Sequence, residues 1–388
     1  MPYGLAATNR ILSYSRGLLS NGFNIDIYIP IPTSRPEEIV QRNSDNIDGI
    51  KYIYTIGRYS NKYKIFRAVS VISGYRLIKG FFATLYKLYA NNKKNRYDLL
   101  IISNDELLYL FVYSWFSLAL KIKSVFIFDE YPVPIRHKLK NKVPLWKEKI
   151  YKYALRNINA YISISDELSN YYNKICCKKT FVMPVITDIT RYSCDSKLNN
   201  DKEKYICYMG NMELSKDNVD LIIKAFSIVI KKYSNINLHL YGQPSIKNKK
   251  YLINIINVLG IEDYVKFKGV VRNTDVPQIL MNSYILVSSQ PKTVRAQGGF
   301  PTKLGEYLSS GVPTIISNVG ENAKHVKNNE HVFLVEPDNC SEYAKKIEYI
   351  IENYGKAKII SNQGRKYVFE NYSNIVVCKK LAFFLRNI

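Results

Sequence analysis

The chain has 388 residues, a formal net charge of +24, 47% hydrophobic residues and 23% charged residues. This length predicts two domains, because one hydrophobic core seldom serves so long a chain, and the composition excludes a disordered or fibrous protein. The six cysteines form no CxxC pair and no Cys/His cluster with metal-ligand spacing. Structural zinc is therefore not expected, and a reducing compartment is favoured.

Charge is distributed unevenly along the chain. Residues 49–97 contain no acidic residue but eleven basic residues interleaved with eleven aromatic ones. Such a face suits an anionic membrane surface, where aromatic rings lie at the headgroups and Lys and Arg neutralise charge. A solvated face on a Lys-rich protein is the alternative interpretation. Nucleic acid is not expected as a partner, because no nucleic-acid-binding motif accompanies the charge.

Neither a membrane span nor a leader segment is expected. The longest apolar run, 107–120, has 14 residues, whereas about 20 are needed to cross a bilayer. Residues 1–8 lack the charged run and apolar core of a signal peptide. We expect a cytoplasmic protein, with peripheral attachment to the inner face of the cell membrane as a further option.

The first half of the chain alternates helix and strand patterns. The predicted strands are 25–29, 50–56, 99–103, 125–128 and 160–164. The predicted helices are 7–20, much of 64–91, an apolar helix from 105, 146–156 and 165–173. Strands separated by helices imply a parallel sheet with right-handed crossovers. No strand precedes the first helix, although a doubly wound domain normally starts with one; we expect that the true start lies upstream or that another segment fills the gap.

The second half repeats the alternation after a polar segment, 187–204. The predicted strands are 205–209, 237–241, 265–268, 285–288, 314–317 and 332–335. The predicted helices are 218–232, 249–259, 275–282 and 341–354, followed by a helical tail from 356. The fold class is therefore α/β, with two doubly wound Rossmann-like domains facing each other. Their ligand should lie at the carboxyl ends of the strands, in the cleft between them.

The stretch GGFPTKLGEYLSSGVPT, 298–314, carries the clearest chemical signal. It predicts a loop, a helix closed by Gly311 and a strand opened by Pro313. The N–H groups at the start of a helix attract anions, and Lys303 adds positive charge there. Glu306 follows within one turn, and its carboxylate can accept hydrogen bonds from a hydroxyl-bearing group. The stretch therefore predicts a site for the diphosphate and the ribose of a nucleotide sugar.

Several segments in this order resemble the retaining glycosyltransferases of family 4, which have the GT-B fold. In the second half these are YMGNMELSKDNVDLIIKAF (208–226), LHLYGQP, GIEDYVKFKGVV, GGFPTKLGEYLSSGVPTI and VFLVEPDN. In the first half GLAATNRILSYSRGLLSNGF, DEYPVPIR and AYISISDEL resemble the family's first helix, acceptor-cleft loop and late strand. The central stretch resembles an FPTKLGEY-type subgroup of the family.

The resemblance implies a domain arrangement and an activity. It implies an acceptor domain over 1–186, a nucleotide-sugar domain over 187–365 and a C-terminal helix over 366–388 that packs back on the first domain. The implied reaction moves a sugar from a nucleoside-diphosphate sugar to an acceptor hydroxyl with retention, in cell-surface polysaccharide or glycoconjugate synthesis. The acceptor is a glycan or a lipid-linked group. Neither a metal ion nor a cofactor is implied.

The resemblance also implies roles for particular residues. Glu306 matches a carboxylate that accepts hydrogen bonds from the ribose, Leu304 a backbone N–H that meets the diphosphate, and Lys216 the lysine that neutralises it. Gly4 matches a glycine loop that closes over the diphosphate. The full set of implied donor-site residues is Gly4, Gly210, Asn211, Val270, Arg272, Thr302, Lys303, Leu304 and Glu306, with Val270 and Arg272 bordering the base.

Two departures from the family pattern affect the donor site. Gly298 stands where the family often has a Glu that touches the transferred sugar, so sugar recognition falls to Gln297, Arg295 or Thr302. Asn211 replaces an Arg that follows the glycine, which leaves Lys216 with more of the phosphate charge.

A third departure affects the acceptor side. Phe128 replaces a His at the end of a strand, and Asp129 and Glu130 follow it. With Lys216, these two carboxylates are the candidate catalytic residues, because catalytic groups gather at strand ends. The alternative is that Asp129 and Glu130 only cap the loop. Glu306 and the lysines would likewise, by default, be solvated surface charges.

Two other functions remain open at this level. A non-catalytic or truncated GT-B partner at the membrane would explain Gly298, Phe128 and the absent first strand. A sugar-nucleotide epimerase shares the architecture, but it needs paired acid–base carboxylates and histidines that the sequence does not place.

Overall fold

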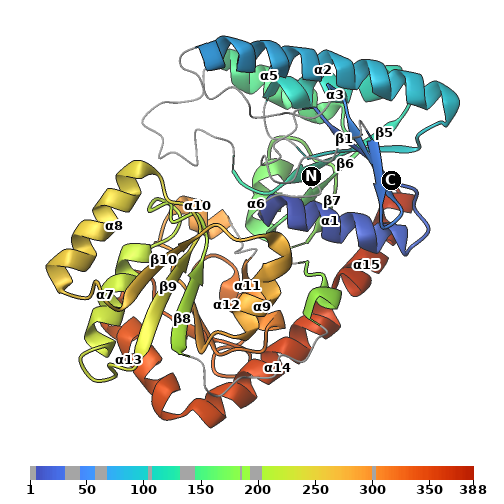
Figure 1. The fold of residues 1–388 in the computed structure, drawn as a ribbon. Helices are drawn as coiled ribbons and strands as arrows, with labels where there is room; N and C mark the ends of the chain where they lie inside the picture. The colour runs from blue at the N-terminus through green and yellow to red at the C-terminus, as the bar shows by residue number, and fades with distance from the viewer. Residues whose placement is uncertain are drawn as a thin grey trace.

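The structure is a computed structural model, and it describes residues 6–30, 44–56, 68–103, 107–131, 145–183, 186–192, 203–298 and 303–388. Figure 1 shows two α/β units, with the C-terminal helices running from the second unit back to the first. The predicted alternation of strands and helices is confirmed in both halves. The sheets are parallel apart from one short strand.

The described part of the N-terminal half contains two sheets. The first has the order β1-β3-β2, with β1 at Asp26–Ile29, β2 at Ser44–Ile47 and β3 at Ile50–Tyr54. The second has the order β4-β5-β6-β7, with β4 at Leu99–Ile102, β5 at Lys123–Phe128, β6 at Ala160–Ser163 and β7 at Lys179–Val182. Within the described ranges no strand joins β1 to β4. The absence of a central strand from this place remains a prediction.

Helices accompany these sheets in the described ranges. They are α1 (Ala6–Leu19), α2 (Ala68–Lys94), α3 (Leu107–Ala119), α5 (Leu145–Arg156) and α6 (Asp166–Asn173). Figure 1 shows α2, α3 and α5 side by side over one face of the domain. The Phe81 ring of α2 packs on Tyr109 of α3 with centroids 5.3 Å apart, and α3 in turn contacts α5 through Trp115 and Tyr153 at 5.4 Å. In the part of the chain that is described, no helix is long and apolar enough to cross a membrane.

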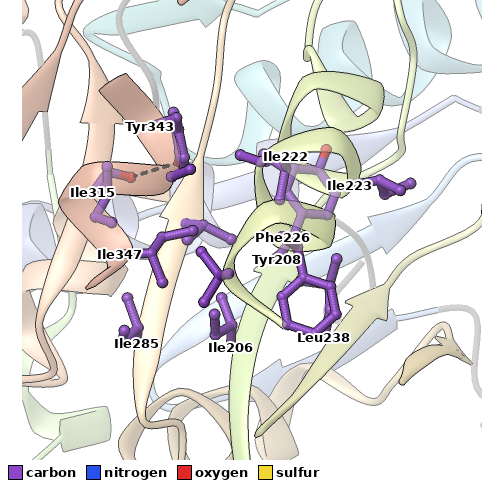
Figure 2. Packing of buried hydrophobic residues seen from close by; sticks show 14 of the residues in the cluster. Ile206, Tyr208, Ile222, Ile223, Phe226, Leu238, Ile285, Ile315, Tyr343 and Ile347 are labelled. Atoms are coloured by element: carbon purple, nitrogen blue, oxygen red, sulfur yellow. Dashed lines mark hydrogen bonds between the residues drawn. The ribbon is translucent and has the colours of Figure 1, made fainter. Parts of the chain in front are cut away.

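The C-terminal half is built on one parallel sheet with the order β10-β9-β8-β11-β12-β13. Its strands are β8 (Lys204–Met209), β9 (Ile236–Tyr241), β10 (Val265–Gly269), β11 (Ile285–Ser288), β12 (Thr314–Ser317) and β13 (Phe333–Val335). These strands are apolar runs because helices cover both faces of the sheet. Figure 2 shows the core on one face, where Phe226 and Ile347 pack over Ile206 and Ile285.

The helices of this half follow the strands in turn. They are α7 (Val219–Val229), α8 (Ile246–Leu259), α9 (Val276–Met281), α10 (Val294–Gly298), α11 (Lys303–Ser309), α12 (Asn322–His325) and α13 (Cys340–Glu352). The predicted helical tail is two helices, α14 (Tyr354–Tyr372) and α15 (Asn374–Arg386). They are separated at Ser373, whose extended backbone ends one helix while its side chain accepts a hydrogen bond from the Val376 N–H.

The tail ties the two halves together. At Gly17 on α1, an added Cβ would lie 2.4 Å from Cys378 Sγ on α15, so only glycine allows this close approach. The linker residue Thr187 donates its N–H to Tyr372 O (3.1 Å) and accepts from Asn374 N–H (2.8 Å). A second tie lies at the start of α6, where the N–H groups of Asp166 and Glu167 donate to the Glu321 carboxylate at 3.2 and 3.1 Å.

Candidate functional site

The candidate site begins where β8 and β9 end side by side. Gly210 follows β8 and Gly242 follows β9, and a Cβ added to Gly242 would lie 1.7 Å from Gly210 O. Gly242 also has a φ of +127°, which side-chain-bearing residues rarely adopt. The two backbones therefore pack directly against each other, and this fixes the position of Gly210.

Lys303, at the start of α11, lies against Gly210. Its Nζ is 2.9 Å from Asp217 Oδ1 and 3.3 Å from Tyr208 OH, and it stands over the Tyr208 ring. Asp217 is buried, and Tyr208 OH donates to its other oxygen at 2.9 Å. Burial raises the pKa of Tyr208 well above its usual value, so this phenol stays a donor. Lys303 is thus a cation held in place by two neighbouring side chains.

Lys216 meets a carboxylate from the other half of the chain. Its Nζ lies 3.3 Å from Oε1 of Glu130, which follows β5. Arg295 on α10 reaches the same carboxylate, with Nη2 at 3.1 Å from Oε2 and 3.4 Å from Oε1. Two cations of one domain therefore enclose one carboxylate of the other, at the carboxyl ends of both sheets.

Asp129, the neighbour of Glu130, has a different environment. Its Oδ1 is 2.6 Å from Nη1 of Arg10, a buried residue of α1. Arg10 Nε also donates to Tyr14 OH, and burial raises the pKa of that phenol. The ion pair holds Asp129 at the end of β5 and places it close to α1.

Glu306 lies in a polar cluster formed by three distant segments. Arg191 Nη1 contacts Glu306 Oε1 at 2.5 Å, while Arg191 Nη2 donates to Asn273 O and Oδ1 at 2.8 and 2.9 Å. Asn9 of α1 donates to Asn273 Oδ1 at 2.8 Å and to Glu306 Oε1 at 3.5 Å. Glu306 is therefore a hydrogen-bond acceptor for two side chains at the junction, and its role toward the ribose stays a prediction.

The remaining predicted residues vary in exposure. Leu304 is buried in a core shared by the two halves, whereas Asn211 is exposed. Val270 is half-buried, and Arg272 is exposed and pairs with Asp275 at 2.9 Å. Gly4 and Thr302 lie outside the described residues. Among the described residues no three His, Cys, Asp or Glu side chains group to hold a metal ion.

Several residues of this arrangement were not predicted from sequence, among them Asn9, Arg10, Arg191, Asp217 and Asn273. Asp217 follows Lys216 directly, and the approach of Lys303 to it depends on the fold. Arg191 and Asn9 are 115 and 297 positions from Glu306, so no local pattern connects them to it.

Comparison with known proteins agrees with this geometry. Residues 193–367 match the family described as Glycosyl transferases group 1. The match covers most of the C-terminal half of the chain and none of the N-terminal half. The match agrees with the predicted glycosyltransferase class, and the matched segment holds Lys216, Lys303 and Glu306.

Curated relatives of the group 1 domain come from bacteria and archaea. The poly(ribitol-phosphate) α-N-acetylglucosaminyltransferase of Staphylococcus aureus is 26% identical over 46% of this chain and 34% of its own length. The capsular polysaccharide biosynthesis glycosyltransferase CapM of S. aureus is 25% identical over 48% of this chain and 49% of its own length. The chain thus spans a third to a half of these relatives.

Solved structures establish the overall fold. Sucrose-phosphate synthase from Thermosynechococcus elongatus superposes with a TM-score of 0.73 at 14% identity, covering 98% of this chain and 93% of that one. Anabaena HepE in complex with UDP gives 0.63 at 17% identity, covering 79% and 82%. The chain has the GT-B fold, as predicted.

Proposed function

We propose that the chain transfers a sugar from a nucleoside-diphosphate sugar to an acceptor hydroxyl, with retained configuration, in the synthesis of a cell-surface polysaccharide or glycoconjugate. One observation carries the proposal: the carboxyl ends of the group 1 sheet present Lys216 3.3 Å from Glu130 of the opposite domain. Ligands of doubly wound domains bind at such ends. The UDP bound to HepE and the polysaccharide relatives support the donor and acceptor classes.

The proposed mechanism uses fixed charge at the leaving group. Lys216 and Lys303 stabilise the charge that gathers on the departing diphosphate, as preorganised donors do in other transferases. The backbones of Gly210 and Leu304 line the same site, and Glu306 accepts hydrogen bonds from the ribose. No metal ion or cofactor is part of this proposal.

The other predicted residues complete the proposed site. Asp129 and Glu130 serve the acceptor side. Val270 and Arg272, which follow β10, border the base, and Asn211, which follows β8, belongs to the same donor site. Gly4 and Thr302 lie outside the described residues, and their roles at the diphosphate and at the sugar stay predictions.

The test is donor turnover. The chain is incubated with a panel of nucleotide sugars after dialysis against a chelator, and release of nucleoside diphosphate is measured with lipid-linked and oligosaccharide acceptors. We expect one donor to be turned over without added metal. Nucleotide binding without turnover of any donor by any acceptor would favour the non-catalytic partner instead.

Replacing Glu306 with glutamine should weaken ribose recognition. The charged acceptor of the ribose hydroxyls is lost, so the KM for the donor should rise about tenfold or more. The wild type should prefer ribonucleoside diphosphates over 2′- and 3′-deoxy forms, and Glu306→Gln should lose this preference. Glu370→Gln, at an exposed carboxylate of α14, is the matched control. An unchanged preference in Glu306→Gln would exclude the ribose role.

A second part of the proposal is attachment to an anionic membrane through the face formed by α2, α3 and α5. These adjacent helices (Figure 1) carry exposed apolar side chains that soluble surfaces usually hide. The exposed apolar residues are Ile78, Phe82, Tyr86, Tyr89, Leu108, Trp115, Leu118, Leu145, Trp146 and Tyr153. Exposed cations accompany them at Lys79, Lys93, Lys94, Arg96, Lys147 and Lys149. Rings and cations on one face match the headgroup region of anionic lipids.

Vesicle sedimentation tests the membrane face. The wild type should sediment with phosphatidylglycerol-containing vesicles and not with pure phosphatidylcholine. The double variant Phe82→Ser/Tyr86→Ser should reduce the bound fraction strongly, because two exposed rings of α2 are lost. Ile246→Ser/Val258→Ser removes equally exposed apolar residues from α8 of the other domain and should bind normally. Equal loss in both double variants would mean that no particular face docks.

A further inference from the structure

Arg295 is a cation at the domain junction. The donor site predicted from sequence gives it no role at the diphosphate. It lies on α10, between β11 and the GGFPTKLGEY stretch, with only 16% of its side chain exposed. Its Nη2 approaches both oxygens of Glu130, and its Nη1 lies 3.6 Å from Glu213 Oε1. The guanidinium is thus held by carboxylates from both domains.

Arg295 and Lys216 converge on a single point. Lys216 Nζ and Arg295 Nη2 lie 3.3 and 3.4 Å from the same atom, Glu130 Oε1. The two cations come from separate segments of one domain, and the anion comes from the other domain. One anionic oxygen therefore lies between an ammonium and a guanidinium, which is the donor set that proteins use to bind phosphate groups.

This ion-pair group is a weak clamp if its only purpose is to hold the domains together. The Lys216 and Glu130 side chains are 39% and 26% exposed. Water and salt reach both of these side chains and compete for their charges, so the Lys216–Glu130 pair is weak. A second anion of higher charge can therefore replace the Glu130 carboxylate at little cost.

The residues near Lys216 supply too little positive charge to neutralise a diphosphate. Asn211 after Gly210 brings no charge, and buried Asp217 offsets much of the charge of the Lys303 ammonium at 2.9 Å. Lys216 and this partly offset Lys303 would therefore face a diphosphate that carries at least two negative charges. Arg295, which contacts the same Glu130 oxygen as Lys216, can supply this additional positive charge.

We propose that Arg295 and Lys216 together bind the diphosphate of the donor, and that Glu130 occupies this site only until the diphosphate enters. The inference rests on the proposed function and assigns diphosphate binding to a residue that the sequence named only as a candidate for sugar recognition. Arg295 contributes a planar guanidinium to the phosphate oxygens, and Lys216 contributes a point charge. The Glu130 carboxylate acts as a competitor for the same two cations.

Calorimetric titration with nucleoside diphosphates and the matching monophosphates tests the assignment. Arg295→Ala should weaken diphosphate binding about ten- to a hundred-fold, with much less effect on the monophosphate. Arg295→Lys should recover part of the loss. Glu130→Gln should strengthen diphosphate binding several-fold, because the competing charge is gone. Lys292→Ala, which removes an exposed cation three positions away, is the matched control and should bind as the wild type does.

The outcomes separate the inference from the proposed function. If no nucleoside diphosphate binds the wild type, the proposed function fails. If the wild type binds but Arg295→Ala binds equally well, the inference alone is wrong. An equal loss of monophosphate and diphosphate binding in Arg295→Ala would show that Arg295 only supports the structure, and unchanged binding by Glu130→Gln would refute the competition.

Discussion

Lys216→Ala is expected to lower the kcat of sugar transfer by about 100- to 1,000-fold. Charge accumulates on the leaving diphosphate in the transition state, and a preorganised cation at that place stabilises it more than the bound donor. Because the effect falls on the transition state, kcat should drop more than the KM of the donor rises. Steady-state release of nucleoside diphosphate at varied donor concentration measures both quantities.

A neighbouring lysine provides the control for this prediction. Lys224 on α7 of the same domain pairs with Asp220 at 3.2 Å on the exposed surface. Lys224→Ala removes the same charge from the domain and should leave turnover within twofold of the wild type. Near-normal turnover in both Lys216→Ala and Glu306→Ala would overturn the assignment of the donor site.

Lys303 is a less suitable target for the same test. Its ammonium neutralises Asp217, which is only 3% exposed. Removing Lys303 would leave a buried carboxylate without its cation, and such changes destabilise proteins by several kcal/mol. Loss of activity in Lys303→Ala would then mix catalysis with folding. Lys216, which is more exposed, avoids this difficulty.

The strands of the C-terminal sheet could be predicted from sequence because they are buried on both faces. Continuous apolar runs such as 285–288 are typical of parallel strands covered by helices. The short strands β2 and β7 were missed. The sequence of β2, SDNI, is polar, and β7, KTFV, is exposed or half-buried along its length, so neither shows the apolar run of a central strand.

The candidate site shows a similar division. The GGFPTKLGEY stretch places Lys303 and Glu306 close together within a few residues, so a local motif could reveal them. Their partners are distant: Asp217 is 86 positions from Lys303, and Arg191 is 115 from Glu306. Such contacts depend on which strand ends meet and how the two domains join. A single sequence contains no period or spacing that encodes them.

The glycines behind Lys303 should be essential for the stability of the C-terminal domain. Gly242→Ala is expected to lower the free energy of unfolding by about 3 kcal/mol or more, because the new methyl group would meet Gly210 O and the φ of +127° is strained for any side chain. Gly260→Ala is the matched control. Gly260 ends α8 with a φ of +65°, and no atom lies within 4 Å of its added Cβ. Gly260→Ala should lower the free energy of unfolding by about 1 kcal/mol, from backbone strain alone.

Urea unfolding of both variants separates the clash from the strain. Gly242→Ala should also weaken nucleoside diphosphate binding, since Gly210 must move and a Cβ at Gly210 would lie only 2.6 Å from Lys303 Nζ. Gly260→Ala should keep wild-type affinity, because the end of α8 is remote from Lys303. Equal destabilisation by the two substitutions would mean that the contact between Gly242 and Gly210 adds nothing to backbone strain. The packing of β8 against β9 would then not be what positions Gly210 beside the Lys303 ammonium.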